Sequence, residues 1–340
     1  MRSSLRHCRF LIGVGVGRSS PLRAAPIIAL AVAVFAIGAC ERRQPASTQD
    51  STVVAPPAAV DSGSPVTTNV GWNPDAGAAL LVAGDVPGIG EVIFPEVTDS
   101  TFGDSALMDL APIRGSRVTL YSRRGEVGSA TVIGEDTTAQ ADSSDDACED
   151  WPLVRLRNES RGPTAPWTVG IAAGHARSIP LDSMDHAARG DSARLADEVV
   201  RLAAGLPGDT AQAFRGLPYY VRSVRRFQPS PGVQALVADV SRRINQEADP
   251  REEQLLFIAE GDSGRTDGPW RVAFSERASG HEGTVETHDI LAALAIGAAR
   301  RPTLVLARYV GDGVAYALLE RDGPARWALR WVSAASGSTQ

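Results

Sequence analysis

The sequence predicts a mainly β protein: a small N-terminal antiparallel barrel or sandwich, one linking helix, and a C-terminal antiparallel β-meander that can be propeller-like. Two observations lead to this fold class. Short runs of β-branched and aromatic residues recur between turn residues, and the 340 residues include 33 glycines and 22 prolines. Only one stretch shows a convincing apolar repeat of 3.6 residues. Short, regularly interrupted strands are typical of antiparallel barrels and sandwiches.

Six strands are expected in a β-rich domain over residues 71–182. Residues Tyr121 to Val127 are expected to turn between two of them, and the acidic stretch from Glu135 to Asp150 to form a loop. The expected strands are Ala79–Val82, Glu91–Phe94, Val118–Tyr121, Thr131–Ile133, Leu153–Leu156 and Trp167–Ile171.

One helix is expected at about residues 191–205, within a linking segment over 190–207. Apolar residues recur at helical spacing from Leu195 to Leu206. Asp191 offers an N-cap, and Gly205 is a typical stop signal.

A β-meander domain is expected over residues 215–335. The stretch Val233–Ile244 also fits a helical stripe, but a strand is preferred there, and Ile290–Ala299 is left undecided. Turn chemistry predicts turns at Pro229–Gly232 and at Asp322–Gly323. The expected strands are Pro218–Phe227, Val233–Arg242, Gln254–Glu260, Trp270–Glu276, Thr303–Val310, Val314–Glu320 and Trp327–Val332.

Residues 1–39 have the pattern of a secretory signal peptide. Five arginines and no acidic residue precede an unbroken apolar run from Ala24 to Ala39, which ends in small residues. The run has 16 residues, fewer than the roughly 20 that a membrane-spanning helix needs. The N-terminus therefore predicts export.

The stretch Ile37-Gly38-Ala39-Cys40 resembles the lipobox of bacterial lipoproteins. The resemblance implies cleavage before Cys40, a diacylglycerol on its sulfur and an acyl chain on its amino group. Such chains hold a protein at a membrane durably, since each buried methylene contributes about 0.8 kcal/mol. Residues 40–70, rich in Ser, Thr, Pro and Ala, are expected to form a disordered tether. In enteric bacteria, an Asp directly after the lipidated cysteine is associated with retention in the inner membrane. This chain has Glu41 at that position, so anchoring at the periplasmic face of the outer membrane is favoured.

The composition excludes several classes of function. Removing residues 1–39 takes the net charge from −6 to −11, because this segment carries five arginines and no acid. An acidic body lacks the basic surface that nucleic-acid binding requires. All 34 basic residues are arginine, which excludes a Schiff base, a Ser-Lys dyad and a P-loop lysine. No cofactor is expected, and Cys148 has no disulfide partner once Cys40 is lipidated.

The end of the chain resembles one degenerate repeat of the FG-GAP or VCBS type. Ile290–Leu294, Pro302–Leu306 and Tyr316–Leu319 carry the likeness. That family builds β-propeller blades with an Asp-rich calcium loop between the first two strands. Residues 295–301 contain no carboxylate here, so the likeness implies a shape and no metal.

Gly261-Asp262-Ser263-Gly264 looks like the nucleophile segment of chymotrypsin-like proteases, with His175 and Asp239 as candidate triad partners in the expected order. Arg265 stands where that family has another glycine. The 88 residues from His175 to Ser263 also leave little room for a two-barrel core. A polar loop between strands is therefore the preferred interpretation of Ser263.

The stretch from His281 to His288 offers two imidazoles and, in Glu282 and Glu286, two carboxylates that zinc can take as ligands. The histidines are seven residues apart rather than the four of a helical pair. In a strand, Glu282, Glu286 and His288 share one face and His281 points away. A solvated loop beside an edge strand is preferred to a metal site.

The sequence favours a non-enzymatic, lipid-anchored binding or scaffolding protein of the cell envelope, with another envelope protein as its partner. Arg and Tyr, which are enriched at protein interfaces, occur together along Tyr219–Phe227. An ordinary half-exposed strand whose arginines pair with surface acids is the preferred interpretation of that stretch. The alternative is an envelope hydrolase that uses Ser263 or a metal near His281 and His288.

Overall fold

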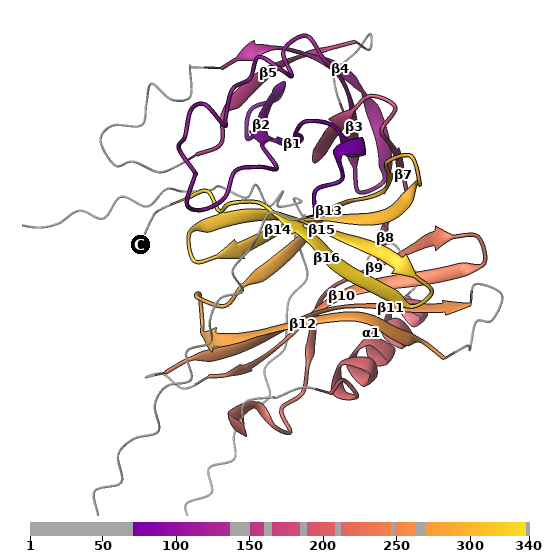
Figure 1. Cartoon of the computed structure of the whole chain (residues 1–340). Coiled ribbons are helices and arrows are strands. Elements are labelled where there is room, and N and C mark those ends of the chain that lie inside the picture. The colour runs from indigo at the N-terminus through magenta and orange to yellow at the C-terminus, as the bar shows by residue number, and fades with distance from the viewer. Residues whose placement is uncertain are drawn as a thin grey trace, which may run out of the picture. The chain divides into compact units, whose positions relative to one another are not determined.

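The computed structural model describes residues 71–136, 150–159, 165–183, 189–207, 212–245, 249–262 and 269–337. They form the strands β1 to β16, the helix α1 and two short 3-10 helices, η1 (Pro74–Ala76) and η4 (Gln212–Phe214). The prediction of a mainly β protein with one helix is confirmed for this part of the chain (Figure 1).

Six N-terminal strands form a closed antiparallel barrel in the order β1-β2-β5-β4-β3-β6. The barrel closes where Leu81 of β1 pairs with Gly170 of β6, so no strand keeps an unpaired edge. Each strand overlaps one of the six predicted runs, and the closure shows that, of the two predicted alternatives, the domain is a barrel and not a sandwich. The strands are β1 (Leu80–Ala83), β2 (Ile89–Ile93), β3 (Arg117–Ser122), β4 (Gly125–Glu135), β5 (Leu153–Asn158) and β6 (Val169–Ala172).

The C-terminal part is the predicted antiparallel meander, and it forms two five-stranded sheets. The outer sheet has the order β12-β11-β10-β9-β8, and the central sheet has the order β16-β15-β14-β13-β7. The outer sheet contains β8 (Asp182–Ser183), β9 (Tyr220–Ser230), β10 (Val233–Ile244), β11 (Arg251–Asp262) and β12 (Arg271–His281). The central sheet contains β7 (Ala176–Ser178), β13 (Thr287–Ile296), β14 (Arg301–Val310), β15 (Gly313–Gly323) and β16 (Arg326–Val332).

The short strands β7 and β8 connect the barrel to both sheets. They follow β6 directly, yet β7 pairs with β13 of the central sheet, and β8 pairs with β9 of the outer sheet. The sequence does not predict either strand, because two or three residues are too few for a periodic pattern.

Three apolar clusters define the layers of the fold. The first joins the barrel interior to one face of the central sheet, the second fills the space between the two sheets, and the third joins the outer sheet to α1. The two sheets are therefore stacked as a sandwich, in place of the propeller-like arrangement that the sequence left open. The barrel, the central sheet, the outer sheet and the helix follow one another as layers (Figure 1).

The position of the central sheet explains why Ile290–Ala299 was undecided. This stretch forms β13 as far as Ile296. Leu291 and Leu294 face the barrel, while Ile290 and Ala293 face the outer sheet. A strand that is buried on both faces is apolar at nearly every position, so its sequence lacks the alternation that separates strands from helices.

The linking helix α1 spans Arg189–Ala204. Val199, Leu202 and Ala203 pack on the outer sheet, as the predicted stripe requires. The prediction that Asp191 is the N-cap is wrong. Asp191 lies in the first turn of α1, where its negative charge interacts favourably with the positive end of the helix dipole. In the described part of the chain, no helix combines the length and apolar character of a membrane span.

The final hairpin turns later than the sequence predicts. Asp322 and Gly323 still belong to β15, and the turn falls on Pro324 and Ala325. Ala325 adopts a positive φ of 49°, a conformation that is uncommon for residues other than glycine. Its N–H donates to Glu260, 2.9 Å away. This contact with the neighbouring sheet stabilises the displaced turn.

Candidate binding site

A hollow of about 860 Å³ lies where the barrel, β8 and β9 meet, and it is the candidate site. Its volume falls within the range of about 300 to 1,000 Å³ that is usual for ligand pockets. The hollow is half-open, and it is lined by Ser122, Arg123, Arg124, Val127, Ala165, Pro166, Trp167, Thr168, Pro180, Leu181, Asp182, Ser183 and Arg225.

The turn between β3 and β4 brings two arginines to the hollow. Ser122 accepts a hydrogen bond from the N–H of Arg124 at 3.2 Å, which fixes the turn. Gly125 completes it with a φ of 138°, a conformation that residues with a Cβ rarely adopt. Arg123 donates from Nε to the carbonyl of Ile290 at 2.6 Å and forms an ion pair with Asp289. Arg123 is thus held against the central sheet, whereas Arg124 is exposed at the tip.

Trp167 and its neighbours provide the apolar wall. A Cβ added to Gly90 would come within 2.9 Å of the Trp167 ring, so the absence of a side chain there makes room for the indole. The next residue, Thr168, donates from Oγ1 to the carbonyl of Leu291 at 2.7 Å. The wall is therefore anchored to both the barrel and the central sheet.

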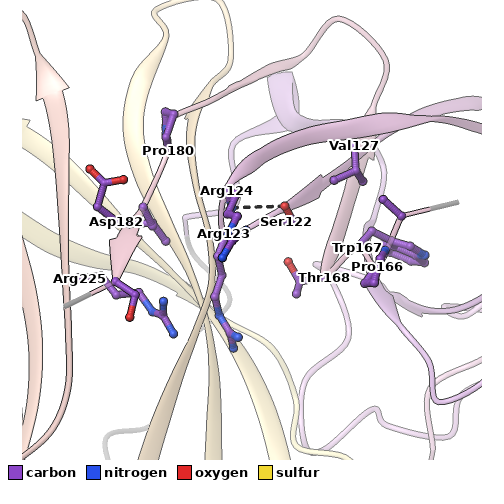
Figure 2. Close-up of a pocket in the computed structure, with 13 residues that line it drawn as sticks. Ser122, Arg123, Arg124, Val127, Pro166, Trp167, Thr168, Pro180, Asp182 and Arg225 are labelled. Atoms are coloured by element: carbon purple, nitrogen blue, oxygen red, sulfur yellow. Dashed lines mark hydrogen bonds between the residues drawn. The ribbon is translucent and has the colours of Figure 1, made fainter. Parts of the chain in front are cut away.

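The opposite wall comes from β8 and β9. Figure 2 shows Asp182 and Arg225 on one side of the hollow, Trp167 and Pro166 on the other, and Arg123 between them. Arg225 belongs to the Arg-Tyr stretch Tyr219–Phe227. The lining of the hollow thus includes three arginines and one aspartate, and one of the arginines, Arg123, is already paired with Asp289.

The structure does not bring His175 and Asp239 together as triad partners. His175 lies exposed after β6, with Nδ1 against the carbonyl oxygen of Asp75. Asp239 is buried on β10, where burial raises its pKa to about 6 against the opposing charges of Arg222 and His288. Ser263 lies outside the described residues, as do Cys40 and Cys148.

The candidate metal ligands lie on the outer sheet (His281), on the central sheet (His288) and in the segment between them (Glu282 and Glu286). His281 ends β12 with 72% of its side chain exposed, and its Nδ1 lies 2.9 Å from Asp249. Glu282 lies in the turn after β12, where its Oε1 is 3.4 Å from Nη1 of Arg243, and Glu286 directly precedes β13, so the two carboxylates do not lie on one strand as predicted. The chain crosses from one sheet to the other here, which separates residues that a single strand would align.

Oε1 of Glu286 lies 3.1 Å from Nε2 of His288, and only 3% of the His288 side chain is exposed. The guanidinium of Arg308 contacts both Glu286 and Glu276. Burial opposes ionisation of Glu286, but hydrogen bonds from His288 and Arg308 outweigh it and lower its pKa to about 2. Arg308 already supplies the cation here. Within the described residues, no group of three or more His, Cys, Asp or Glu side chains is arranged to hold a metal ion.

Sequence reasoning missed the hollow as a unit. Its segments are separated by up to about 100 residues along the chain, so no local spacing connects them. The signals available were the arginines of the predicted turn and the Arg-Tyr strand.

Comparisons with protein-family models, curated proteins and solved structures found no match.

Proposed function

We propose that this protein is a lipoprotein of the cell envelope, held at a membrane by lipid on Cys40, and that its folded part binds another envelope protein without catalysis. One observation supports the binding function most strongly. The hollow unites arginine and tryptophan, the side chains most enriched among residues that dominate binding energy, on walls fixed to the fold by hydrogen bonds.

The lipobox and the tether support the location. An exported chain with acyl groups on its first residue remains at a bilayer, and a tether of about 30 residues gives the folded part reach. A partner in the same compartment can then enter the hollow from its open side.

Photo-crosslinking in intact cells tests the binding function. Benzoyl-phenylalanine in place of Ala165, an exposed residue of the hollow, is expected to give a discrete adduct with a second protein. The same group in place of Val310, which is 54% exposed and does not line the hollow, provides the matched control. Adducts are resolved by mass and identified by mass spectrometry.

The expected result is an adduct at position 165 that is absent at position 310. Adducts of equal yield at both positions, or no adduct at position 165, would contradict the proposal, because the hollow would then be no preferred contact surface.

A further inference from the structure

We infer that the carboxyl group of Asp239 is a proton-sensitive latch between the outer sheet and the central sheet. With a proton on this group the two sheets stay closed on each other, and loss of the proton loosens the part of their interface that surrounds Asp239. Three features of the molecule support this: the contrast between the two halves of the interface, the isolation of Asp239, and the charges that face it.

One half of the interface is apolar and firmly closed. Ala235 and Val237 of β10 belong to the apolar cluster between the sheets. At the end of this half, Glu260 accepts hydrogen bonds from Nε and Nη2 of Arg321, at 2.6 and 2.8 Å, and from Nε1 of Trp327 at 2.7 Å. The Glu260 carboxylate therefore joins β11 of the outer sheet to β15 and β16 of the central sheet.

The other half of the interface is polar. Alternate residues of a strand share a face, so Asp239 follows Val237 into the space between the sheets. Side chains from β11, β12, β13 and β14 enter the same space. The members of this polar half are Asp239, Glu252, Glu276, His288 and Arg308. A region with few buried apolar contacts opens at a lower free-energy cost than an apolar core.

Asp239 is isolated within the polar half. The residue is only 4% exposed, and its Oδ1 has no hydrogen-bond partner among the described residues. By contrast, Glu252 lies 3.0 Å from Nε of Arg243, and Glu276 lies 2.8 Å from Nη2 of Arg308. A buried carboxylate without a hydrogen bond is costly to keep ionised, so Asp239 is the acid on which a proton gains most.

Charged groups face Asp239 from three neighbouring strands. Arg222 is the extra residue of a β-bulge in β9, and such bulges redirect a side chain. Glu252 of β11 lies 3.8 Å from Arg222, and β13 contributes His288 and Asp289. Burial has the largest influence and raises the pKa of Asp239 from 3.8 to about 6, because the two cations that oppose the shift are offset by the two acids.

The sign of the pH dependence follows from the burial of this carboxyl group. Between about pH 3.8 and 6, the closed interface keeps the Asp239 proton that an opened, water-exposed interface gives up, so closure is favoured at low pH and weakens as pH rises through this window. The pKa difference corresponds to a change of about a hundredfold in the equilibrium between closed and opened forms.

Hydrogen–deuterium exchange of the full chain, measured by mass spectrometry from pH 4.5 to 8, tests the inference. Dividing the observed rates by the intrinsic amide rates at each pH gives an opening constant. In the wild type, the opening constant of residues 239–244 is expected to rise at least about tenfold over this range. Residues 233–237, in the apolar half, are expected to stay at least about tenfold more protected at pH 8.

Two variants assign the effect to the carboxyl group. Asp239→Asn keeps the shape of the side chain and cannot ionise, so it is expected to lower the opening constant of residues 239–244 at pH 8 by about tenfold or more and to abolish most of its rise with pH. Asp197→Asn makes the same change at an exposed residue of α1, and it is expected to match the wild type within about twofold.

Two results would overturn the inference. A rise of the wild-type size that persists in Asp239→Asn would show that another group titrates. Equal opening constants for residues 233–237 and 239–244 in the wild type would show that the interface opens only when the whole protein unfolds. The second comparison requires no variant, so it holds even if Asp239→Asn does not fold.

Discussion

Replacing Glu253 with alanine should lower the free energy of unfolding by about 3 to 5 kcal/mol, because it leaves a buried arginine without its counter-charge. Glu253 is 0% exposed on β11. Its Oε2 accepts from Nε of Arg242 at 2.5 Å and from Arg277 at 3.1 Å, and it lies 3.3 Å from the hydroxyl of Tyr219. Arg242 is itself buried, so water cannot replace the lost carboxylate.

The cation–π contact between Arg242 and the ring of Tyr219, at 4.6 Å, cannot compensate for that loss, since such contacts contribute about 0.5 to 2 kcal/mol. Urea unfolding followed by tryptophan fluorescence measures the effect. The matched control is Glu198→Ala, which removes the exposed i,i+3 pair with Arg201 on α1 and should cost at most about 0.5 kcal/mol.

Adding Arg242→Met to Glu253→Ala should recover part of the lost stability, since it removes the charge that Glu253→Ala leaves unpaired. A loss of stability in Glu253→Ala no larger than in Glu198→Ala would show that Arg242 reaches solvent, and it would contradict the prediction.

Replacing Glu91 with glutamine should stabilise the protein at alkaline pH. Glu91 lies on β2 where the barrel meets the central sheet, and the hydroxyl of Tyr316 donates to its Oε2 at 2.9 Å. Burial, aided by the charges of Asp150 and Asp85, raises its pKa from 4.5 to about 7, although the Tyr316 hydrogen bond opposes the shift.

The sign of the pH dependence follows from this shift. Between pH 4.5 and 7 the folded protein keeps the Glu91 proton that the unfolded chain has lost, so stability falls as pH rises through this window and levels off above it. The full penalty is about 3 kcal/mol. Glutamine keeps an oxygen for Tyr316 and carries no charge, so it avoids the penalty.

Urea unfolding at several pH values tests this prediction. The stability gain of Glu91→Gln over the wild type should grow from near zero at pH 4.5 to about 3 kcal/mol at pH 8. Glu96→Gln, at an exposed nearby residue, should leave the pH dependence as it is. A Glu91→Gln gain that does not vary with pH would show that Glu91 does not titrate in this range.

The strands were predictable where one face is apolar and turns bound the run. All six barrel strands and the β3–β4 turn meet that condition, since residues such as Val118 and Leu120 recur between glycine-rich breaks. The strands of the central sheet were less predictable, because β13 is covered on both faces and so is apolar at nearly every position. Local pattern thus predicts strands, while burial on two sides is a tertiary property that the pattern cannot show.

The candidate site was less predictable, because pairing between distant strands creates it. Arg124 and Arg225 share the hollow because β7 and β8 cross from the barrel into the two sheets. The same kind of crossing places His281 and His288, only seven residues apart, on different sheets. Sequence spacing therefore suggested a metal site at His281 and His288, which the two sheets divide. It overlooked the hollow, which pairing between distant strands assembles.

We propose that acyl chains on Cys40 hold the folded part of this protein at the envelope. Mass spectrometry of the N-terminal peptide from membrane-fraction protein tests this proposal most directly. We expect a chain that begins at Cys40 and carries a diacylglycerol and an amide-linked acyl group. A membrane-associated chain whose Cys40 is unmodified, or that retains residues 1–39, would contradict it.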